Sequence, residues 1–249
     1  MGLRTERRGP VTVLTLDDPE RRNALSGTMV AEIVAAVRAA QDDAGVSALV
    51  VTGAPPAFCS GADTSNLRSL GGGGGESGSV ASLYDGFLAV RGASLPTVAA
   101  VNGPAVGAGF NLALCCDVRV AGASARFDSR FARIGLHPGG GHTWMLERAV
   151  GPQTAAAMAL FGVPVDGRRA AELGLAWSCV ADDAVLDTAV ALATRAGDVP
   201  RELAASVKQS LREAPWVADF DAAVHAELVR QQASFERGWV AERLAARRG

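Results

Sequence analysis

Two short segments of small residues are placed to do chemistry with their main-chain N–H groups. Residues 57–63, AFCSGAD, follow an apolar run and a turn, and residues 102–111, NGPAVGAGFN, leave one apolar run and enter another. Small side chains allow a ligand to approach the backbone closely, and N–H groups at the start of a helix favour negative charge. Two such donors that converge on one carbonyl oxygen would form an oxyanion hole. Close helix–strand packing also explains each segment alone, but the pair, about 45 residues apart, favours the oxyanion hole.

The composition agrees with a site that works through its backbone. The 249 residues include 29 glycines but only three histidines and one tyrosine. With 24 basic and 26 acidic residues, the chain lacks the basic surface by which proteins bind nucleic acid or anionic membranes. The four cysteines show no spacing typical of zinc sites, redox pairs or disulfide frameworks. We therefore expect reduced thiols and a cytoplasmic protein.

The elements that must position the two segments alternate between strand and helix. The residue pattern predicts strands at 11–16, 48–52, 97–101 and 118–121, and helices at 28–40 and 107–115. This alternation indicates an α/β layer fold. Residues 97–116 lack charge over the length of a membrane span, but Asn102, Pro104 and the glycines predict a buried strand, a tight turn and a buried helix instead. The glycine run at 71–75 predicts a surface loop.

The last third of the chain has a different pattern. It predicts helices at 152–161, 183–196, 200–214 and 215–247, interrupted by one short strand at 176–180. Pro200 and Pro215 lie where a first-turn proline belongs. The tail of about 50 residues cannot bury its apolar faces alone, so we expect it to pack on the core or on another subunit.

Four stretches together resemble the crotonase (enoyl-CoA hydratase/isomerase) superfamily. They read DDPERRNALSGTMVAEI at 17–33, ALVVTGAPPAFCSGAD at 48–63, LPTVAAVNGPAVGAGFNLALCCDVRVAGASARF at 95–127 and RAAELGLAWSCV at 169–180. The resemblance covers roughly residues 11–215. It implies an α/β fold with a repeated ββα spiral core over residues 1–195, and a C-terminal helical trimerisation region over residues 196–249 in a homotrimer or a dimer of trimers.

The resemblance also implies an acyl-CoA thioester as the ligand. Its carbonyl oxygen would be held, as an enolate forms, by the N–H groups of Ala62 and Ala108. Coenzyme A is then part of the substrate, and no separate cofactor or metal is expected. Arg22 resembles the basic residue that meets the CoA phosphates, although an exposed arginine on a loop is as often solvated surface. The further residues that the resemblance assigns to substrate and CoA binding are Cys59, Ser60, Gly61, Asp63, Gly107, Gly109 and Phe131.

Three positions depart from the hydratase pattern. Asn111 and Phe131 stand where related hydratases carry two glutamates, and Gly139 stands near a third carboxylate position. Neither an amide nor a phenyl ring exchanges protons near neutral pH, so we expect the two-glutamate addition of water to be absent or very weak. Asn111 can still donate a hydrogen bond to substrate or hold a water molecule.

Two other side chains are candidate acids or bases. Asp128 qualifies if it faces the pocket, although Arg126 and Arg130 favour a surface ion pair. His137 is the second candidate, like His142 on the far side of the same glycine-rich turn, because histidine is the commonest acid–base side chain in enzymes, although a histidine there is more often exposed or hydrogen-bonded locally. Two histidines without a nearby acidic ligand make a weak metal site.

The leading hypothesis is an enzyme of fatty-acid or related acyl-CoA metabolism. It would be an isomerase, a lyase or an altered hydratase that stabilises an enolate, with Asn111 and either His137 or Asp128 supplying proton chemistry. The alternative is a catalytically silent acyl-CoA-binding protein, because the binding loops survive while the carboxylates do not. A dinucleotide-binding domain fits poorly, since the glycines follow the spacing Gly103-x-x-x-Gly107-x-Gly109 rather than GxGxxG.

Overall fold

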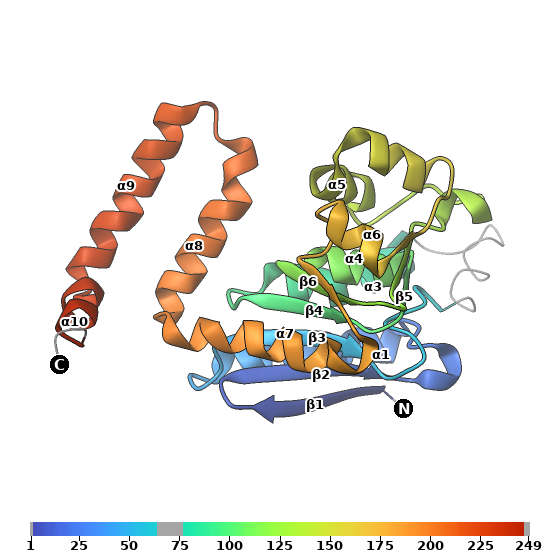
Figure 1. Cartoon of the computed structure of the whole chain (residues 1–249), viewed down its shortest axis with the longest axis horizontal. Coiled ribbons are helices and arrows are strands. Elements are labelled where there is room, and N and C mark those ends of the chain that lie inside the picture. The colour runs from blue at the N-terminus through green and yellow to red at the C-terminus, as the bar shows by residue number, and fades with distance from the viewer. Residues whose placement is uncertain (1, 64–76, 247–249) are drawn as a thin grey trace.

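Two β-sheets form the centre of the computed structural model, which describes residues 2–63 and 77–246 (Figure 1). Among these residues the larger sheet has the strand order β1-β2-β3-β4-β6-β9 and the smaller sheet the order β5-β7-β8. Only β1 is antiparallel to its neighbour in the larger sheet, and β5 and β7 are parallel. The strands are β1 (Gly2–Arg8), β2 (Val11–Asp17), β3 (Ala48–Gly53), β4 (Thr97–Val101), β5 (Pro104–Val106), β6 (Val118–Gly122), β7 (Arg126–Asp128), β8 (Val165–Asp166) and β9 (Ser178–Val180).

Helices cover both faces of the larger sheet. Helix α7 (Val185–Thr194) packs on one face, against Val50, Val98 and Ala100. The helices α1 (Gly27–Asp42), α3 (Ser77–Gly92) and α4 (Ala108–Cys115) join the opposite face in a separate apolar cluster. A sheet buried on both faces needs nearly continuous apolar strands, which is why the apolar runs predicted β2, β3, β4 and β6 to within about two residues at each end.

The segment around residues 97–116 confirms the prediction of strand, turn and buried helix. It forms β4, then β5 in the smaller sheet, then α4, and β6, β7 and α5 (His142–Ala159) repeat the ββα order. Together with the similar solved structures reported below, this layout confirms the α/β fold class. Within the part of the chain that the structure describes, we find no helix both apolar enough and long enough to cross a bilayer.

Two predicted boundaries are wrong, and one strand was not predicted, for identifiable reasons. Pro152 predicts a helix start, but α5 already begins at His142 and only changes direction at Gly151, whose φ is 75°. The antiparallel strand β1 was not predicted because its side chains are mostly charged and exposed. The predicted strand at 176–180 begins only at Ser178. The glycine run at 71–75 lies outside the described residues.

The C-terminal helices leave the body of the protein as an arm. Figure 1 shows α8 (Arg201–Glu213), α9 (Phe220–Glu236) and α10 (Trp239–Ala246) projecting beyond the edge of the larger sheet. The prediction of one helix over 215–247 is wrong, because Gly238 adopts a φ of 76° between α9 and α10. The buried Lys208 anchors α8, since its Nζ lies 2.6 Å from Asp117 and also donates to the carbonyl of Leu95.

Short helical turns complete the connections. They are α6 (Gly167–Glu172) and the 3-10 helices Pro19–Arg21, Phe131–Ile134, Asp182–Ala184, Arg195–Asp198 and Ala214–Trp216. The boundary proposed at residue 195 falls at the end of α7, where the chain passes from the sheet to the arm. That division into two regions stays a prediction.

Candidate active site

The two segments of small residues, 57–63 and 102–111, lie against each other, as their sequence patterns predict. Cys59 joins them: its N–H donates to the carbonyl of Pro104 at 3.0 Å, and its carbonyl accepts from Val106 at 2.9 Å. Gly109 packs so closely on Cys59 that a Cβ at this position would lie 2.7 Å from the Cys59 Cβ. The first turn of α4 and the loop after β3 therefore form one rigid junction.

The N–H of Ala62 is unpaired at this junction. Its neighbours pair with Leu25 in a parallel bridge, since Leu25 donates to the Gly61 carbonyl at 2.7 Å and Asp63 donates to the Leu25 carbonyl at 3.2 Å. In parallel pairing the residue between two such bonds points its own N–H to the opposite side. Ala62 is partly exposed, and its N–H has no acceptor among the residues that the structure describes.

The N–H of Ala108 also has no acceptor among the described residues, for a different reason. Ala108 is the first residue of α4, so no preceding helical turn supplies an acceptor. Gly107, at a φ of 53°, donates to the carbonyl of Asp128 at 2.9 Å and so fixes the start of the helix. A Cβ on Gly61 would lie 3.5 Å from the nitrogen of Ala108, which shows how closely the donor-bearing loops approach. The junction thus offers two free donors, one of them at a helix N-terminus where the dipole favours an anion.

A third loop supports the first segment. Ser60 donates twice to it, through its N–H to the Arg22 carbonyl and through its Oγ to the Arg21 carbonyl, both at 3.0 Å. Arg21 also lies 3.3 Å from the Asp63 carboxylate. The side chain of Arg22 is exposed beside these bonds. Its predicted contact with CoA phosphates stays a prediction.

Asn23 is a site residue that sequence reasoning missed. It is fully buried with a φ of 58°, and its Nδ2 donates to the carbonyls of Ala54 and Ala57, each at 2.7 Å. Its Oδ1 accepts from the N–H of Asp18 at 3.0 Å. One amide therefore joins the Asp18 loop to the loop that carries Ala62.

We expect Asn23→Ala to lower the free energy of unfolding by about 2 kcal/mol, because it leaves two buried carbonyls and one N–H without partners. Chemical denaturation measures this loss. The matched control is Thr28→Ala, an exposed position on the neighbouring helix, which should change stability by less than about 0.5 kcal/mol. Equal effects of the two substitutions would contradict the role assigned to Asn23.

Asn111 lies one turn beyond Ala108, within a chain of buried polar side chains. Its Nδ2 donates to the Gly139 carbonyl at 2.9 Å, and its Oδ1 lies 2.7 Å from Nδ1 of His142. Nε2 of His142 lies 2.9 Å from Oγ of Ser129. Ser129, His142 and Asn111 are each at most 2% exposed. The ring of Phe131, which is partly exposed, meets the imidazole edge-on at 5.0 Å.

The other acid–base candidates are arranged differently. Asp128 is ion-paired as expected, but it is buried rather than on the surface, and both of its carboxylate oxygens contact Arg130. His137 is exposed, with its Nδ1 2.7 Å from the carbonyl of Pro138. A Cβ at Gly139 would overlap the hydroxyl of Tyr84. A carboxylate at this third position would therefore need Tyr84 to move.

The buried imidazole gives a pH-dependent stability. Burial among the rings of Phe110 and Phe131 lowers the pKa of His142 from 6.5 to about 4. Between these two pKa values the His142 imidazole is protonated in the unfolded chain and neutral in the folded chain. The free energy of unfolding therefore falls as the pH decreases from the unfolded pKa to the folded one. From about pH 7 to about pH 4.5 this group should remove about 2 kcal/mol of stability.

Denaturation of the wild type and of His142→Gln at both pH values isolates that contribution. The wild type should lose about 2 kcal/mol more than the variant between the two conditions. An equal loss in both proteins would show that His142 titrates normally.

Metal and thiol chemistry find little support at this site. Over residues 2–63 and 77–246 no group of three histidine, cysteine or acidic side chains gathers to bind a metal. Burial raises the pKa of the Cys59 thiol to about 12, so it stays protonated at neutral pH. The backbone of Cys59, rather than its sulfur, serves the junction.

The pairing of Ser129 with His142 had no signal in the sequence. The two residues are 13 positions apart and His142 is 31 positions from Asn111, so neither pair falls at a helical or strand repeat. Of these two residues, only His142 could be named from the sequence, as one of three histidines. The contact follows from the path of the chain from β7 to α5.

The chain is similar to known proteins over nearly its whole length. The sequence profile of the family "Enoyl-CoA hydratase/isomerase" matches residues 6–241. A probable enoyl-CoA hydratase, EchA14, of Mycobacterium tuberculosis H37Rv is 48% identical over 243 residues, which are 95% of this chain and 93% of that protein.

The chain is also similar to solved structures over nearly its whole length. An enoyl-CoA hydratase from Polaromonas sp. JS666 superposes with a TM-score of 0.92 at 28% identity, covering 99% of this chain and 96% of that one. A protein from Thermobifida fusca YX, solved in complex with CoA, superposes with a TM-score of 0.83 at 31% identity, covering 95% of this chain and 93% of that one.

Proposed function

Because the chain belongs to the enoyl-CoA hydratase/isomerase family, we propose that it binds an acyl-CoA thioester and stabilises an enolate at the N–H groups of Ala62 and Ala108. The observation that carries this proposal is the pair of unpaired donors at one rigid junction. The Thermobifida fusca structure, which holds CoA in the same fold, supports the ligand class.

The proposed chemistry begins when the thioester carbonyl oxygen accepts both hydrogen bonds. Transfer of a proton from the α carbon to a base, for which His137 and Asp128 are the candidate side chains, puts negative charge on that oxygen, and preorganised donors stabilise it without reorganisation. One donor of this kind contributes a factor of about 10²–10³ in rate in measured cases. Two donors therefore account for a large share of the barrier.

The proposed reaction is an isomerisation, a lyase step or an altered hydration in fatty-acid or related acyl-CoA metabolism. Asn111, Phe131 and Gly139 supply no carboxylate, so the two-glutamate addition of water is not proposed. Coenzyme A enters as part of the substrate, and no further cofactor is proposed. We also propose a cytoplasmic location, supported by four cysteines that form no disulfides in the structure's described residues.

Turnover of an acyl-CoA panel tests the proposal. Purified protein is incubated with enoyl-, dienoyl- and malonyl-type CoA esters, products are resolved by chromatography, and binding of each ester is measured by calorimetry. We expect binding and product from at least one ester. Binding without any product above the blank would favour the second candidate function, a silent acyl-CoA-binding protein, which the missing carboxylates make a specific alternative.

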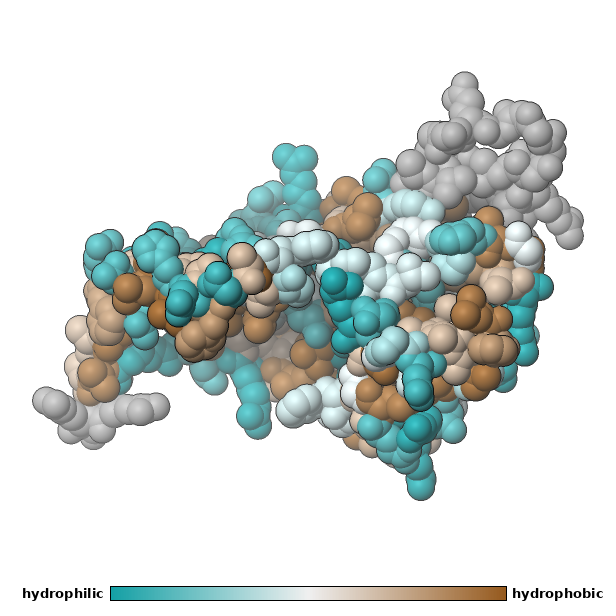
Figure 2. All heavy atoms as spheres, turned by 90° about the horizontal axis from the view of Figure 1, so that it is seen from above, coloured by the Kyte–Doolittle hydropathy of each residue, from teal (hydrophilic) through white to brown (hydrophobic). Residues whose placement is uncertain are grey.

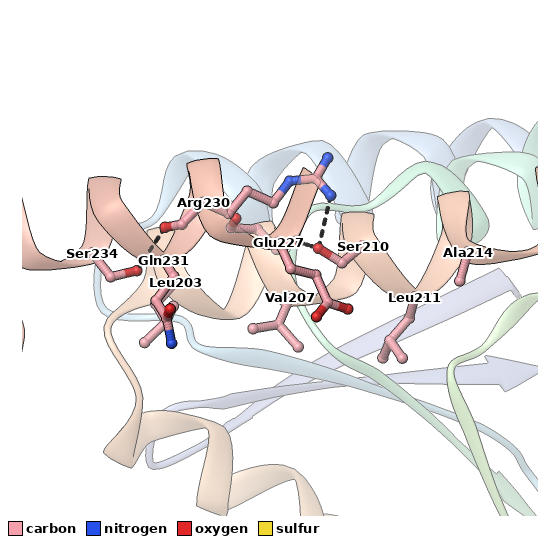
Figure 3. Close-up of a pocket in the computed structure, with 10 residues that line it drawn as sticks. Leu203, Val207, Ser210, Leu211, Ala214, Glu227, Arg230, Gln231 and Ser234 are labelled. Carbon is pink, nitrogen blue, oxygen red and sulfur yellow. Dashed lines mark hydrogen bonds between the residues drawn. The ribbon is translucent and has the colours of Figure 1, made fainter. Parts of the chain in front are cut away.

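We further propose that the arm formed by α8, α9 and α10 joins copies of this chain in a homotrimer or a dimer of trimers. Large apolar side chains are exposed along it, with Leu211 72%, Trp216 69% and Phe220 80% accessible. Figure 2 shows apolar surface, coloured brown, along this projecting arm. Figure 3 shows the pocket between α8 and α9, where Val207 and Leu211 share the lining with Glu227 and Arg230.

The oligomeric state is measured by size-exclusion chromatography with light scattering. We expect a mass of three or six chains for the wild type, and dissociation for the double variant Val207→Glu and Leu211→Glu, because it charges the apolar face. The control is Gln209→Glu, an exposed polar position on the same helix. A wild type that elutes as a monomer would refute this part of the proposal.

A further inference from the structure

The hydrogen bonds that link the side chains of Ser129, His142 and Asn111 all run in one direction. The amide nitrogen of Asn111 donates to the Gly139 carbonyl, which can only accept, so the amide oxygen faces the imidazole. That oxygen also only accepts, so Nδ1 of His142 carries the hydrogen. In the neutral imidazole Nε2 is then bare and accepts the hydroxyl hydrogen of Ser129.

This is the order of groups that activates a nucleophile. A hydroxyl donates to a base at 2.9 Å, and the base is oriented by an acceptor on its other nitrogen at 2.7 Å. Many nucleophilic serine enzymes on unrelated folds use a hydroxyl, a base and an orienting acceptor in this arrangement. The lowered pKa of His142 keeps its imidazole neutral near pH 7, so Nε2 stays available.

These three hydrogen-bonded residues are also connected to the start of α4, where Ala108 lies. Asn111 follows Ala108 by one helical turn, and its N–H donates to the Gly107 carbonyl at 3.0 Å. Gly107 donates in turn to the carbonyl of Asp128, the residue just before Ser129. The end of β7, which leads into Ser129, is thereby held against the start of α4, which carries the Ala108 N–H.

The turn that carries Ser129 is held in an uncommon conformation. Arg130 has a φ of 57°, which non-glycine residues adopt rarely and which stores strain at functional sites. Asp128 fixes this turn, because its two oxygens accept from the N–H of Arg130 at 2.9 Å and from its guanidinium at 2.8 Å. Phe131 then donates its N–H to the Ser129 carbonyl at 2.6 Å.

From this geometry we propose that Ser129 is a nucleophile, and that the protein transfers acyl groups from CoA thioesters to water. His142 acts as the base and Asn111 is a positioning residue. The inference rests on the proposed function for the binding of an acyl-CoA at Ala62 and Ala108. It needs no carboxylate to move protons at the α or β carbon, and so it fits the residues found at positions 111, 131 and 139.

The proposed reaction acylates Ser129 and then hydrolyses the acyl ester. Oγ of Ser129 forms a bond to the thioester carbon while its proton passes to Nε2 of His142, and the carbonyl oxygen becomes an oxyanion at the two N–H groups. The C–S bond then breaks, and the CoA sulfur leaves with the proton from His142. Water attacks the resulting acyl ester, gives one proton to His142, and releases the carboxylic acid as Ser129 recovers its hydrogen.

Saturated acyl-CoA esters test this step cleanly, because they offer no double bond to hydrate or isomerise. Release of the CoA thiol from acetyl- to octanoyl-CoA is followed with a thiol reagent. We expect release by the wild type, and at least about a 100-fold lower rate in Ser129→Ala. Acid-quenched wild type should carry the acyl group on the peptide that contains Ser129, and Ser129→Cys should also become acylated.

Ser178→Ala serves as the matched control, since it removes another buried serine hydroxyl, one that has no hydrogen-bond partner in the described part of the chain. It should release thiol at the wild-type rate. If Ser129→Ala fails to fold, the acyl group found on wild-type Ser129 decides the question without that variant. Thiol release unchanged in a folded Ser129→Ala would overturn the proposal.

Exchange of α protons in deuterated water, followed by NMR, separates the two proposals. A wild type that binds acyl-CoA and exchanges α protons, but releases no thiol and carries no acyl group on Ser129, overturns the nucleophile and leaves the enolate function standing. A wild type that neither binds an acyl-CoA nor exchanges protons overturns both.

Discussion

Replacing Ala108 by proline is expected to lower kcat for acyl-CoA turnover by about 10²–10³-fold while the fold is kept. The substitution deletes one N–H and nothing else that the structure uses, because this group has no acceptor among the described residues. Ala108 is the first residue of α4, and proline is well tolerated there since its ring suits the first turn of a helix. The loss corresponds to about 3–4 kcal/mol of transition-state stabilisation.

Steady-state kinetics on the best ester of the panel, with thermal unfolding of each protein, measures this effect. Ala108→Ser is the matched control, because it changes the side chain but keeps the N–H, and it should retain activity within a few-fold. Wild-type kcat in a folded Ala108→Pro would show that this N–H does not stabilise the reacting oxygen. Loss of both activity and fold in the proline variant would move the test to Ala62→Pro.

Substituting Gly109 by alanine should have the second large effect, on activity and stability together. A Cβ there would overlap the carbonyl oxygen of Cys59 and lie 2.7 Å from the Cys59 Cβ. The loop with Ala62 and the helix with Ala108 must then move apart. Overpacking of this kind costs about 1–3 kcal/mol of folding free energy, and a displacement of about 1 Å between binding groups can cost about 10²-fold in rate.

Gly27→Ala is the control for this substitution. A Cβ at Gly27 meets no atom within 4 Å, and the residue is the first of helix α1, so alanine should be neutral or stabilise by up to about 1 kcal/mol. Chemical denaturation and kcat measured on both variants make the comparison. Gly109→Ala with wild-type activity would mean that the spacing of the two loops is not critical.

The fold was largely predictable because its signals are local. A sheet buried on both faces requires apolar strands, and those runs are continuous in β2, β3, β4 and β6. The strand β1 and the first half of α5 escaped prediction. The strand β1 has mostly charged side chains, which give no apolar pattern. In α5, Pro152 follows the bend at Gly151 and looks like the start of a helix.

Some features of the candidate site are likewise local in the sequence, and others depend on the tertiary structure. By itself the sequence indicated the family, through its resemblance to the crotonase superfamily, and the two segments of small residues, because close backbone approach depends on small residues at consecutive positions. The roles of Ala62 and Ala108 follow from that resemblance and stay predictions. The sequence also determined that Asn111, Phe131 and Gly139 carry no carboxylate.

Only the tertiary structure decided which polar side chains meet. The chain from Ser129 through His142 to Asn111 joins residues separated by 13 and 31 positions, and Asn23 bonds to carbonyls 31 and 34 positions away. Such contacts depend on how helices and loops pack, and no repeat in the sequence encodes them. Hydrogen bonds also require partners within about 3 Å, a condition that only the folded chain can meet.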